Sequence, residues 1–225
     1  MSRAFGPILA SQTNMQIVDA RIERYLKDTY DDGDPVRAEM ESFARKKGFP
    51  IVGPLVGRTL TVLARAVGAR RVFELGSGYG YSALHFARAV GPEGVVHCTD
   101  LSEANAKLAE SLLSRAGVWS RVVYHCEEAI GALRRIGGSW DVVFNDIDKE
   151  SYPETIDLAY ERLRPGGLFI TDNVLWSGRV LGGKARDRSP STDGVVEFTK
   201  MLFSHPGFVT TVDPTRDGLA VAVRV

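Results

Sequence analysis

Two stretches of this sequence decide how the chain is interpreted: Phe144-Asn145-Asp146-Ile147-Asp148-Lys149 and Thr171-Asp172-Asn173-Val174-Leu175-Trp176. Each follows a short apolar run that is typical of a buried strand. Consecutive parallel strands commonly lie side by side, with their carboxyl ends at one edge of the sheet. We therefore expect Asp146, Asp172 and Asn173 to converge at such an edge.

The chemistry of these three side chains indicates a metal site. They offer oxygen donors, and no His or Cys stands next to them in the sequence. Hard divalent cations prefer such ligands, so we expect Mg²⁺ first, then Mn²⁺ or Ca²⁺. A metal site at a sheet edge predicts an enzyme.

From Arg71 onward, strand-like runs alternate with helical segments. The strand-like runs are 72–74, 94–99, 122–125, 141–145 and 168–171, and the helical segments between them are 81–90, 102–116, 129–136 and 153–163. Such alternation implies right-handed crossovers, and hence a parallel sheet with helices on both faces. The fold class is α/β.

The two ends of the chain depart from this alternation. Before it we expect three helices, over 17–26, over 35–47 with Asp34 as N-cap, and over 54–67. After it, a helix over 192–203 precedes two β-rich runs, 208–212 and 219–225. A Pro/Asp/Gly connector joins these runs, which predicts a hairpin and an antiparallel last strand.

Composition places the chain among single-domain soluble proteins. Its 225 residues are 44% hydrophobic, and 28 basic side chains balance 28 acidic ones. We expect one domain over 1–225 whose first fifty residues form a helical extension for the acceptor or a dimer. Balanced charge does not favour a nucleic-acid partner, although a local basic patch is compatible with it. With no apolar run of ~18 residues and no signal-like segment in 1–13, we expect a cytoplasmic protein without a membrane partner.

The two cysteines, Cys98 and Cys126, each stand in an apolar strand-like run. We expect two buried, reduced thiols rather than a disulfide, and their spacing does not indicate a metal site.

A glycine-rich loop, Glu74-Leu75-Gly76-Ser77-Gly78-Tyr79-Gly80-Tyr81-Ser82, follows the first of the strands and opens a helix. Asp100 ends the next strand, where a carboxylate can accept hydrogen bonds from a ribose diol. NAD and S-adenosylmethionine both fit so far. Glu74 favours the second, because a carboxylate would repel a pyrophosphate, whereas S-adenosylmethionine presents an ammonium and a sulfonium.

Taken together, these motifs resemble the cation-dependent O-methyltransferases that include catechol and caffeoyl-CoA O-methyltransferases. The resemblance runs from about Pro50 to the C-terminus. It rests on Glu74-Leu75-Gly76 with Gly80-Tyr81-Ser82, on Asp100, on 144–149 with Tyr152, on 172–176 with Gly178, and on Asp217-Gly218.

The resemblance implies a Rossmann-like methyltransferase with a seven-stranded, mostly parallel sheet whose last strand is antiparallel. It also implies S-adenosylmethionine as cosubstrate and a homodimer. Its cofactor contacts correspond here to Val52, Glu74, Gly76, Ser77, Ser82, Asp100, Ala129 and Asp148. Its metal ligands correspond to Asp146, Asp172 and Asn173, and its catalytic lysine to Lys149.

Two positions depart from the family pattern, Asn145 and Ile147, where a small apolar residue and alanine are commonest. Both changes leave the carboxylates and Lys149 in place, so we expect them to bear on substrate fit rather than on chemistry.

The sequence thus predicts methyl transfer from S-adenosylmethionine to a hydroxyl of a small catechol-like or phenolic acceptor, assisted by Mg²⁺ that Asp146 helps to hold. Lys149 serves either as the base or as an electrostatic stabiliser of the oxyanion. One alternative keeps this chemistry on a hydroxylated tRNA nucleoside. Another, of a different class, is an NAD-dependent oxidoreductase or a nucleotide-sensing module. The loop 177–193 is either a lid or a connector.

Overall fold

A computed structural model of the chain describes residues 17–182 and 187–225. Its centre is a single seven-stranded sheet with the order β3-β2-β1-β4-β5-β7-β6. The strands are β1 (Arg71–Leu75), β2 (Val95–Thr99), β3 (Val122–His125), β4 (Trp140–Asn145), β5 (Leu163–Thr171), β6 (Phe208–Asp213) and β7 (Leu219–Arg224).

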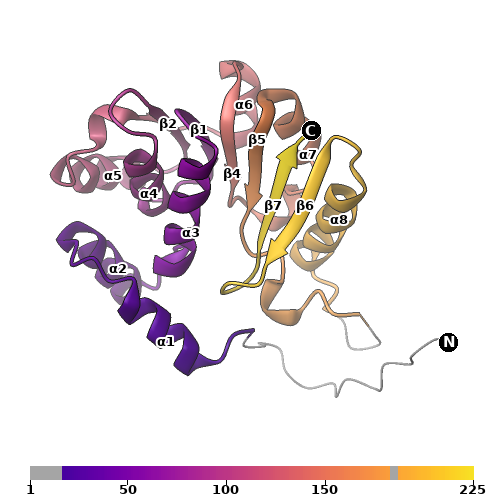
Figure 1. Cartoon of the computed structure of the whole chain (residues 1–225), viewed down its shortest axis with the longest axis horizontal. Coiled ribbons are helices and arrows are strands. Elements are labelled where there is room, and N and C mark those ends of the chain that lie inside the picture. The colour runs from indigo at the N-terminus through magenta and orange to yellow at the C-terminus, as the bar shows by residue number, and fades with distance from the viewer. Residues whose placement is uncertain (1–16, 183–186) are drawn as a thin grey trace.

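Only β7 runs against its neighbours. The pairs β1–β2, β1–β4, β2–β3 and β4–β5 are parallel, and β7 is antiparallel to both β5 and β6. The long hairpin of β6 and β7 is visible in yellow in Figure 1. The predicted sheet, including its antiparallel last strand, is confirmed.

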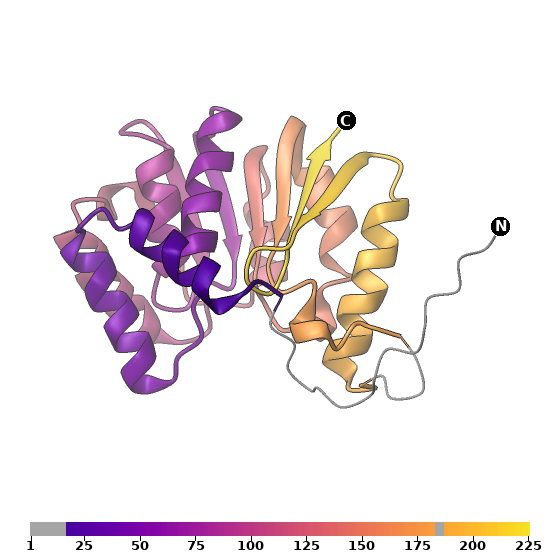
Figure 2. The same cartoon turned by 60° about the horizontal axis from the view of Figure 1, so that its bottom comes forward.

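Helices cover both faces of the sheet (Figure 1). The helices are α1 (Ala20–Thr29), α2 (Pro35–Lys47), α3 (Gly53–Ala66), α4 (Tyr81–Ala89), α5 (Glu103–Arg115), α6 (Ala129–Ile136), α7 (Thr155–Arg162) and α8 (Pro190–Ser204). Short 3-10 turns are η1 (Trp119–Arg121), η2 (Lys149–Ser151) and η3 (Trp176–Gly178). In Figure 2, α3, α4 and α5 lie on one side and α6, α7 and α8 on the other.

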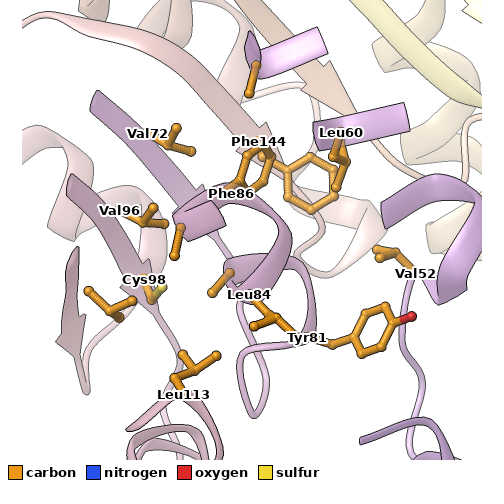
Figure 3. Close-up of a cluster of buried hydrophobic side chains, with 14 of the residues drawn as sticks. Val52, Leu60, Val72, Tyr81, Leu84, Phe86, Val96, Cys98, Leu113 and Phe144 are labelled. Atoms are coloured by element: carbon orange, nitrogen blue, oxygen red, sulfur yellow. The ribbon is translucent and has the colours of Figure 1, made fainter. Parts of the chain in front are cut away.

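Each face of the sheet has its own apolar core. On the α3–α5 side, Phe86 of α4 packs on Phe144 of β4 with ring centroids 5.6 Å apart, and Leu60 of α3 joins them (Figure 3). On the other side, Phe169 of β5 packs on Phe198 of α8. Burial of one side chain of this size stabilises the folded state by about 1.5–3 kcal/mol, so the two cores stabilise the packing of helices on both faces of the sheet.

Most predicted elements are confirmed to within a few residues, and α2 shows why. Asp34 accepts a hydrogen bond from the Val36 amide (3.0 Å), Pro35 opens the helix, and Gly48 ends it with φ 64°. The first helix was predicted three residues too early. Since α1 buries no residue, its apolar spacing does not set its ends, and Asp19 caps it instead.

Two further expectations need correction. The β5 strand begins at Leu163 rather than at Leu168, because Trp140 of β4 pairs with Leu163 across an irregularity in the register. Both cysteines are free, as expected, but only Cys98 is buried, while Cys126, which follows β3, is exposed. Within the described ranges no helix is both long and apolar enough to cross a bilayer. Residues 1–13 and part of the loop 177–193 lie outside the described residues.

Candidate active site

The glycine-rich loop joins β1 to α4 with a backbone that only glycine adopts readily. Gly76 and Gly80 have φ values of 82° and 87°. A Cβ on Gly76 would lie 2.6 Å from the carbonyl oxygen of Asp146. The loop therefore packs directly against the end of β4, which brings the first motif to the second.

Hydrogen bonds of the Thr99 and Ser77 backbone and hydroxyl groups fix the loop to the ends of β1 and β2. The Ser77 amide donates to the Thr99 carbonyl (2.7 Å), and the Thr99 amide donates to the Ser77 hydroxyl (3.1 Å). The Thr99 hydroxyl accepts from the Gly76 amide (3.1 Å) and donates to the Glu74 carbonyl (2.9 Å). These bonds hold the loop open toward a ligand rather than collapsed on itself.

Glu74 is fully buried beneath the loop and is not one of the residues that line the cavity described below. Burial raises the pKa of its carboxyl to about 7, and the hydroxyls of Ser82 and Ser77 oppose that shift. Its Oε1 has no hydrogen-bond partner. A buried acceptor without a partner suits a cationic or N–H ligand.

Asp100 lies just after β2, on the wall of the same cavity. Its Oδ1 accepts hydrogen bonds from the Ser102 amide (2.8 Å) and from the Asn105 side chain (3.0 Å). The N-cap of α5 is Ser102, whose hydroxyl accepts from the Asn105 amide (3.2 Å). Capping of α5 therefore does not account for Asp100.

The second edge of the site is formed by the ends of β4 and β5. Asn145 pairs with Thr171 in the sheet register, so Asp146 and Asp172 follow on adjacent parallel strands, as predicted. The Asp146 amide donates to the Leu75 carbonyl (2.9 Å), and the Asp172 amide donates to the Asn145 carbonyl (3.1 Å). The three strand ends β1, β4 and β5 are thus bonded in series.

The two aspartates repel each other, and Asp172 is buried whereas the Asp146 side chain is 25% exposed. Burial raises the pKa of the Asp172 carboxyl, and the negative charge of Asp146 raises it further. Burial also raises the pKa of Asp146, although Lys149 opposes the shift. The Asp172 Oδ1 is buried without a hydrogen-bond partner. A divalent cation would neutralise both carboxylates and engage this oxygen, so the residues present fit such an ion.

The protein would supply few ligands to such a cation. In the part of the chain that the structure describes, no three His, Cys, Asp or Glu side chains are grouped as a metal site. The third protein ligand would have to be the Asn173 side chain. Asn173 lines the cavity and has φ 61°, a left-handed conformation that strains a non-glycine residue.

Lys149 begins η2 and is largely buried, with a side chain 12% exposed. Its Nζ donates to Asp146 Oδ1 (2.9 Å) and to the Ile147 carbonyl (3.2 Å). The ammonium also lies 4.9 Å from the ring centroid of Tyr152 and 5.8 Å from that of Trp176. The two rings and Asp146 fix its position at the cavity wall.

Tyr152 supports this edge from behind. It is fully buried, and its hydroxyl donates to the Asp172 carbonyl (2.9 Å). Asn145 also bonds behind the strand ends, because its Nδ2 donates to Thr155 Oγ1 of α7 (3.3 Å). Of the two departures from the family pattern, only Ile147 lines the cavity, so Asn145 bears on the support of the strand ends rather than on substrate fit.

One cavity of about 830 Å³ brings these residues together. Its lining includes seven of the eight predicted cofactor contacts, all but Glu74, together with Asp146, Lys149, Asp172 and Asn173. The seven are Val52, Gly76, Ser77, Ser82, Asp100, Ala129 and Asp148. Phe49, Trp176 and Arg216 also line this cavity.

Two residues of this edge escaped the sequence argument. Arg216, in the β6–β7 connector, lines the cavity although it is distant in sequence from every motif except Asp217-Gly218. Gly194 lies inside α8, where a Cβ would collide with the Lys149 carbonyl. A glycine inside a helical pattern signals such a close approach, but it does not name the partner.

Comparison with known proteins agrees with this geometry. A family model described as O-methyltransferase matches residues 34–225. A catechol O-methyltransferase from Niastella koreensis is 32% identical, covering 93% of this chain and 99% of its own length. A catechol O-methyltransferase from Mycobacterium tuberculosis is 32% identical over 90% of this chain and 94% of its own.

Solved structures give the same result. The O-methyltransferase from Bacillus cereus in complex with SAH superposes with a TM-score of 0.80 at 28% identity, covering 91% of this chain and 97% of that one. The O-methyltransferase TomG from Streptomyces achromogenes, in complex with SAM, has a TM-score of 0.81 at 28% identity, covering 91% and 96%. The family model begins at residue 34, so α2 belongs to the matched region, whereas the resemblance had been placed from about Pro50. The chain therefore belongs to the O-methyltransferase family, which confirms the enzyme class expected from its motifs.

Proposed function

We propose that this enzyme transfers a methyl group from S-adenosylmethionine to a hydroxyl of a small catechol-like acceptor, with help from a divalent cation, Mg²⁺ first. One observation carries the proposal. Two adjacent strand ends present the carboxylates of Asp146 and Asp172, the second of them buried, on the same cavity wall as Lys149 and the glycine loop. The names of the relatives, catechol and caffeoyl-CoA O-methyltransferases, support a phenolic acceptor.

The donor would occupy the half of the cavity formed by the glycine loop. Gly76, Ser77 and Ser82 would border its methionine part, with Val52 and Asp148 nearby. Glu74 would compensate the ammonium through the loop, because its Oε1 is buried without a partner. Asp100 would accept hydrogen bonds from the ribose, and Ala129 would pack beside the adenine. Enzymes of the NAD-dependent class need no such buried acid under the loop.

The acceptor would lie at the other end, over Asp146, Asp172 and Asn173. A bound cation would supply Lewis acidity that lowers the pKa of an acceptor hydroxyl. Lys149, whose Nζ is fixed 2.9 Å from Asp146, would either accept the hydroxyl proton as a neutral amine or, as an ammonium, stabilise the oxyanion that remains. Trp176 and Phe49 would exclude water from the reacting atoms. They would also limit how the acceptor can lie, and methyl transfer to oxygen is an in-line displacement that needs a fixed approach.

A methylation assay tests this proposal. Catechol, phenol and resorcinol are incubated with the enzyme, S-adenosylmethionine and Mg²⁺, and the products are identified by mass spectrometry. We expect catechol alone to be methylated efficiently, EDTA to abolish the reaction, and Mg²⁺ to restore it. Full activity in the chelator would reject the cation.

Incubation of total tRNA with labelled cofactor distinguishes the alternative acceptor. The balanced charge of the chain gives no support to a nucleic-acid substrate. Label in tRNA but not in catechol would replace the small-molecule proposal. The single-domain organisation over 1–225, the homodimer and the cytoplasmic location stay predictions.

A further inference from the structure

Arg216 is a positively charged residue at the acceptor end of the site. It belongs neither to the cofactor contacts nor to the ligands of the divalent cation. It lines both the main cavity and a neighbouring one of about 210 Å³. The second cavity is bordered by Ile17, Val18 and Glu23 from the N-terminal segment and by Asn173. Figure 2 shows the β6–β7 connector passing close to the chain that leads into α1.

The connector is fixed rigidly against the loop that carries Asn173. The Leu175 amide donates to the Asp217 carbonyl (2.9 Å), and the Val174 amide donates to the Gly218 carbonyl (3.0 Å). The Ser177 amide donates to the Asp217 carboxylate. The position of Arg216 relative to the cation ligands is therefore set by main-chain bonds rather than by a flexible loop.

The backbone at Arg216 is itself strained. Its φ is 56°, a left-handed conformation that glycine adopts freely and arginine does not. A left-handed non-glycine residue destabilises a fold by about 1–3 kcal/mol and is concentrated at functional sites. The presence of a long cationic side chain at such a position argues for a role of that side chain.

The guanidinium is only partly engaged. Its Nη1 donates to the Ile51 carbonyl, and within the described residues it forms no other hydrogen bond and no ion pair. Of the acids that line the smaller cavity with Arg216, Glu23 pairs with Lys27 (2.6 Å) and Asp217 accepts from Ser177. Arg216 shares both cavities with Asn173 and the main cavity with Asp146 and Asp172, which places it at the cation end.

Charge along the main cavity points to what Arg216 would bind. Its described lining has six carboxylates, Asp100, Glu127, Glu128, Asp146, Asp148 and Asp172, and two cations, Lys149 and Arg216. Lys149 is paired with Asp146. The carboxylates would repel an anionic substituent along most of this wall, and Arg216 is the cation of the described lining that no carboxylate pairs.

We propose that Arg216 is a specificity-determining residue, which favours catechol-like acceptors that carry a carboxylate on the ring away from the reacting hydroxyls. Its free N–H groups would meet that carboxylate in a charge-assisted, two-bond contact. The inference rests on the proposed function, since it takes the reacting hydroxyls to lie over Asp146, Asp172 and Asn173.

Matched acceptors test the inference by binding rather than by turnover. Titration calorimetry of the enzyme with S-adenosylhomocysteine and Mg²⁺ compares 3,4-dihydroxybenzoate with the neutral 3,4-dihydroxybenzamide. We expect the acid to bind about tenfold more tightly, a modest ratio because Arg216 is an exposed residue. Arg216→Gln should abolish the ratio through weaker binding of the acid, and Arg216→Lys should restore part of it.

Arg45→Gln is the control, because it removes the same charge from a side chain that is 71% exposed on α2 and lines neither cavity. Equal affinity of the two acceptors for the wild type, failure of both to bind, or a preference that survives Arg216→Gln overturns the inference. So does an equal loss of S-adenosylhomocysteine binding in Arg216→Gln, which would make the arginine a cofactor contact. Tenfold selective binding without methyl transfer to either acceptor would instead reject the proposed function and leave the inference standing.

Discussion

The two loops that form the site solve the same backbone problem in opposite ways. The loop under the donor turns with glycines at its left-handed positions, Gly76, Gly78 and Gly80. Among the described residues, the non-glycine residues with positive φ are Asn173, Trp176, Ser177 and Arg216, and all lie at the acceptor edge.

The chain keeps side chains at the acceptor edge at the expense of stability. Glycine at the donor end gives up a side chain and lets the ligand approach the backbone. At the acceptor end, each strained residue lowers stability by about 1–3 kcal/mol, and three of the four line the main cavity. In the proposed arrangement, the glycine loop would therefore border the donor with main chain, whereas the acceptor edge would meet its ligands with side chains.

The largest effect is expected at Asp172. Asp172→Asn should lower kcat by about 10³-fold, the scale of losing a principal electrostatic contact in a water-excluded site. The ligand-free protein should not lose stability, because the change removes a buried charge that Asp146 repels. Thermal unfolding with and without Mg²⁺ checks this: the wild type should gain about 2.7 kcal/mol at 100 times Kd, and the variant much less.

Asp157→Asn is the matched control, since that carboxylate on α7 is 82% exposed. It should keep both the activity and the Mg²⁺ response. A Mg²⁺ response that survives Asp172→Asn would place the cation elsewhere and dissolve the contrast between the two edges.

Lys149 comes next. Lys149→Met should lower kcat by about 10²–10³-fold, in the range typical of a general acid or base, with little change in the KM of the donor. Lys149→Arg separates the two roles, because a guanidinium keeps the charge but cannot accept a proton. Recovery of kcat in Lys149→Arg identifies an electrostatic stabiliser, and no recovery identifies a base. Unchanged kcat in Lys149→Met contradicts both.

Much of the donor edge, together with the strand ends Asp146 and Asp172 of the acceptor edge, was predictable from sequence because local patterns determine these residues. The glycine loop, Asp100 and the strand ends Asp146 and Asp172 each follow directly from a strand, and parallel pairing brings such ends together. The helix over 35–47 was predictable for a similar reason, since its cap and its first proline are adjacent residues.

The acceptor edge was less predictable because it depends on contacts between distant segments. Arg216 reaches the site through bonds from 174–177 to 217–218, and no spacing in the sequence indicates that pairing. Gly194 matters only because α8 crosses η2. Glu74 stood out in the sequence by its charge, yet its complete burial beneath the loop follows from the packing of β1 between β2 and β4.

Glu74 gives a smaller, pH-dependent effect at the donor edge. Burial raises its folded-state pKa to about 7, above its value of 4.5 in water, so the ligand-free protein loses stability as pH rises from about 4.5 to 7. A cationic donor favours the ionised carboxylate. Calorimetry should therefore find S-adenosylhomocysteine binding about tenfold tighter at pH 8 than at pH 6. Glu74→Gln should remove this dependence, and a pH-independent wild type would contradict the assignment.

The smallest effect tests the comparison itself. Ser177 has φ 53° at the acceptor edge, and Gly91 has φ 75° with open space where a Cβ would be. Ser177→Gly should raise the free energy of unfolding by about 0.5 kcal/mol, because the relief of strain exceeds the added entropy of the unfolded chain. Gly91→Ala should lower it by a similar amount for the converse reason. Urea denaturation measures both. If Ser177→Gly instead destabilises the protein, contacts of the Ser177 side chain outweigh its backbone strain. The acceptor edge would then not be strained relative to the donor edge, and the comparison would fail.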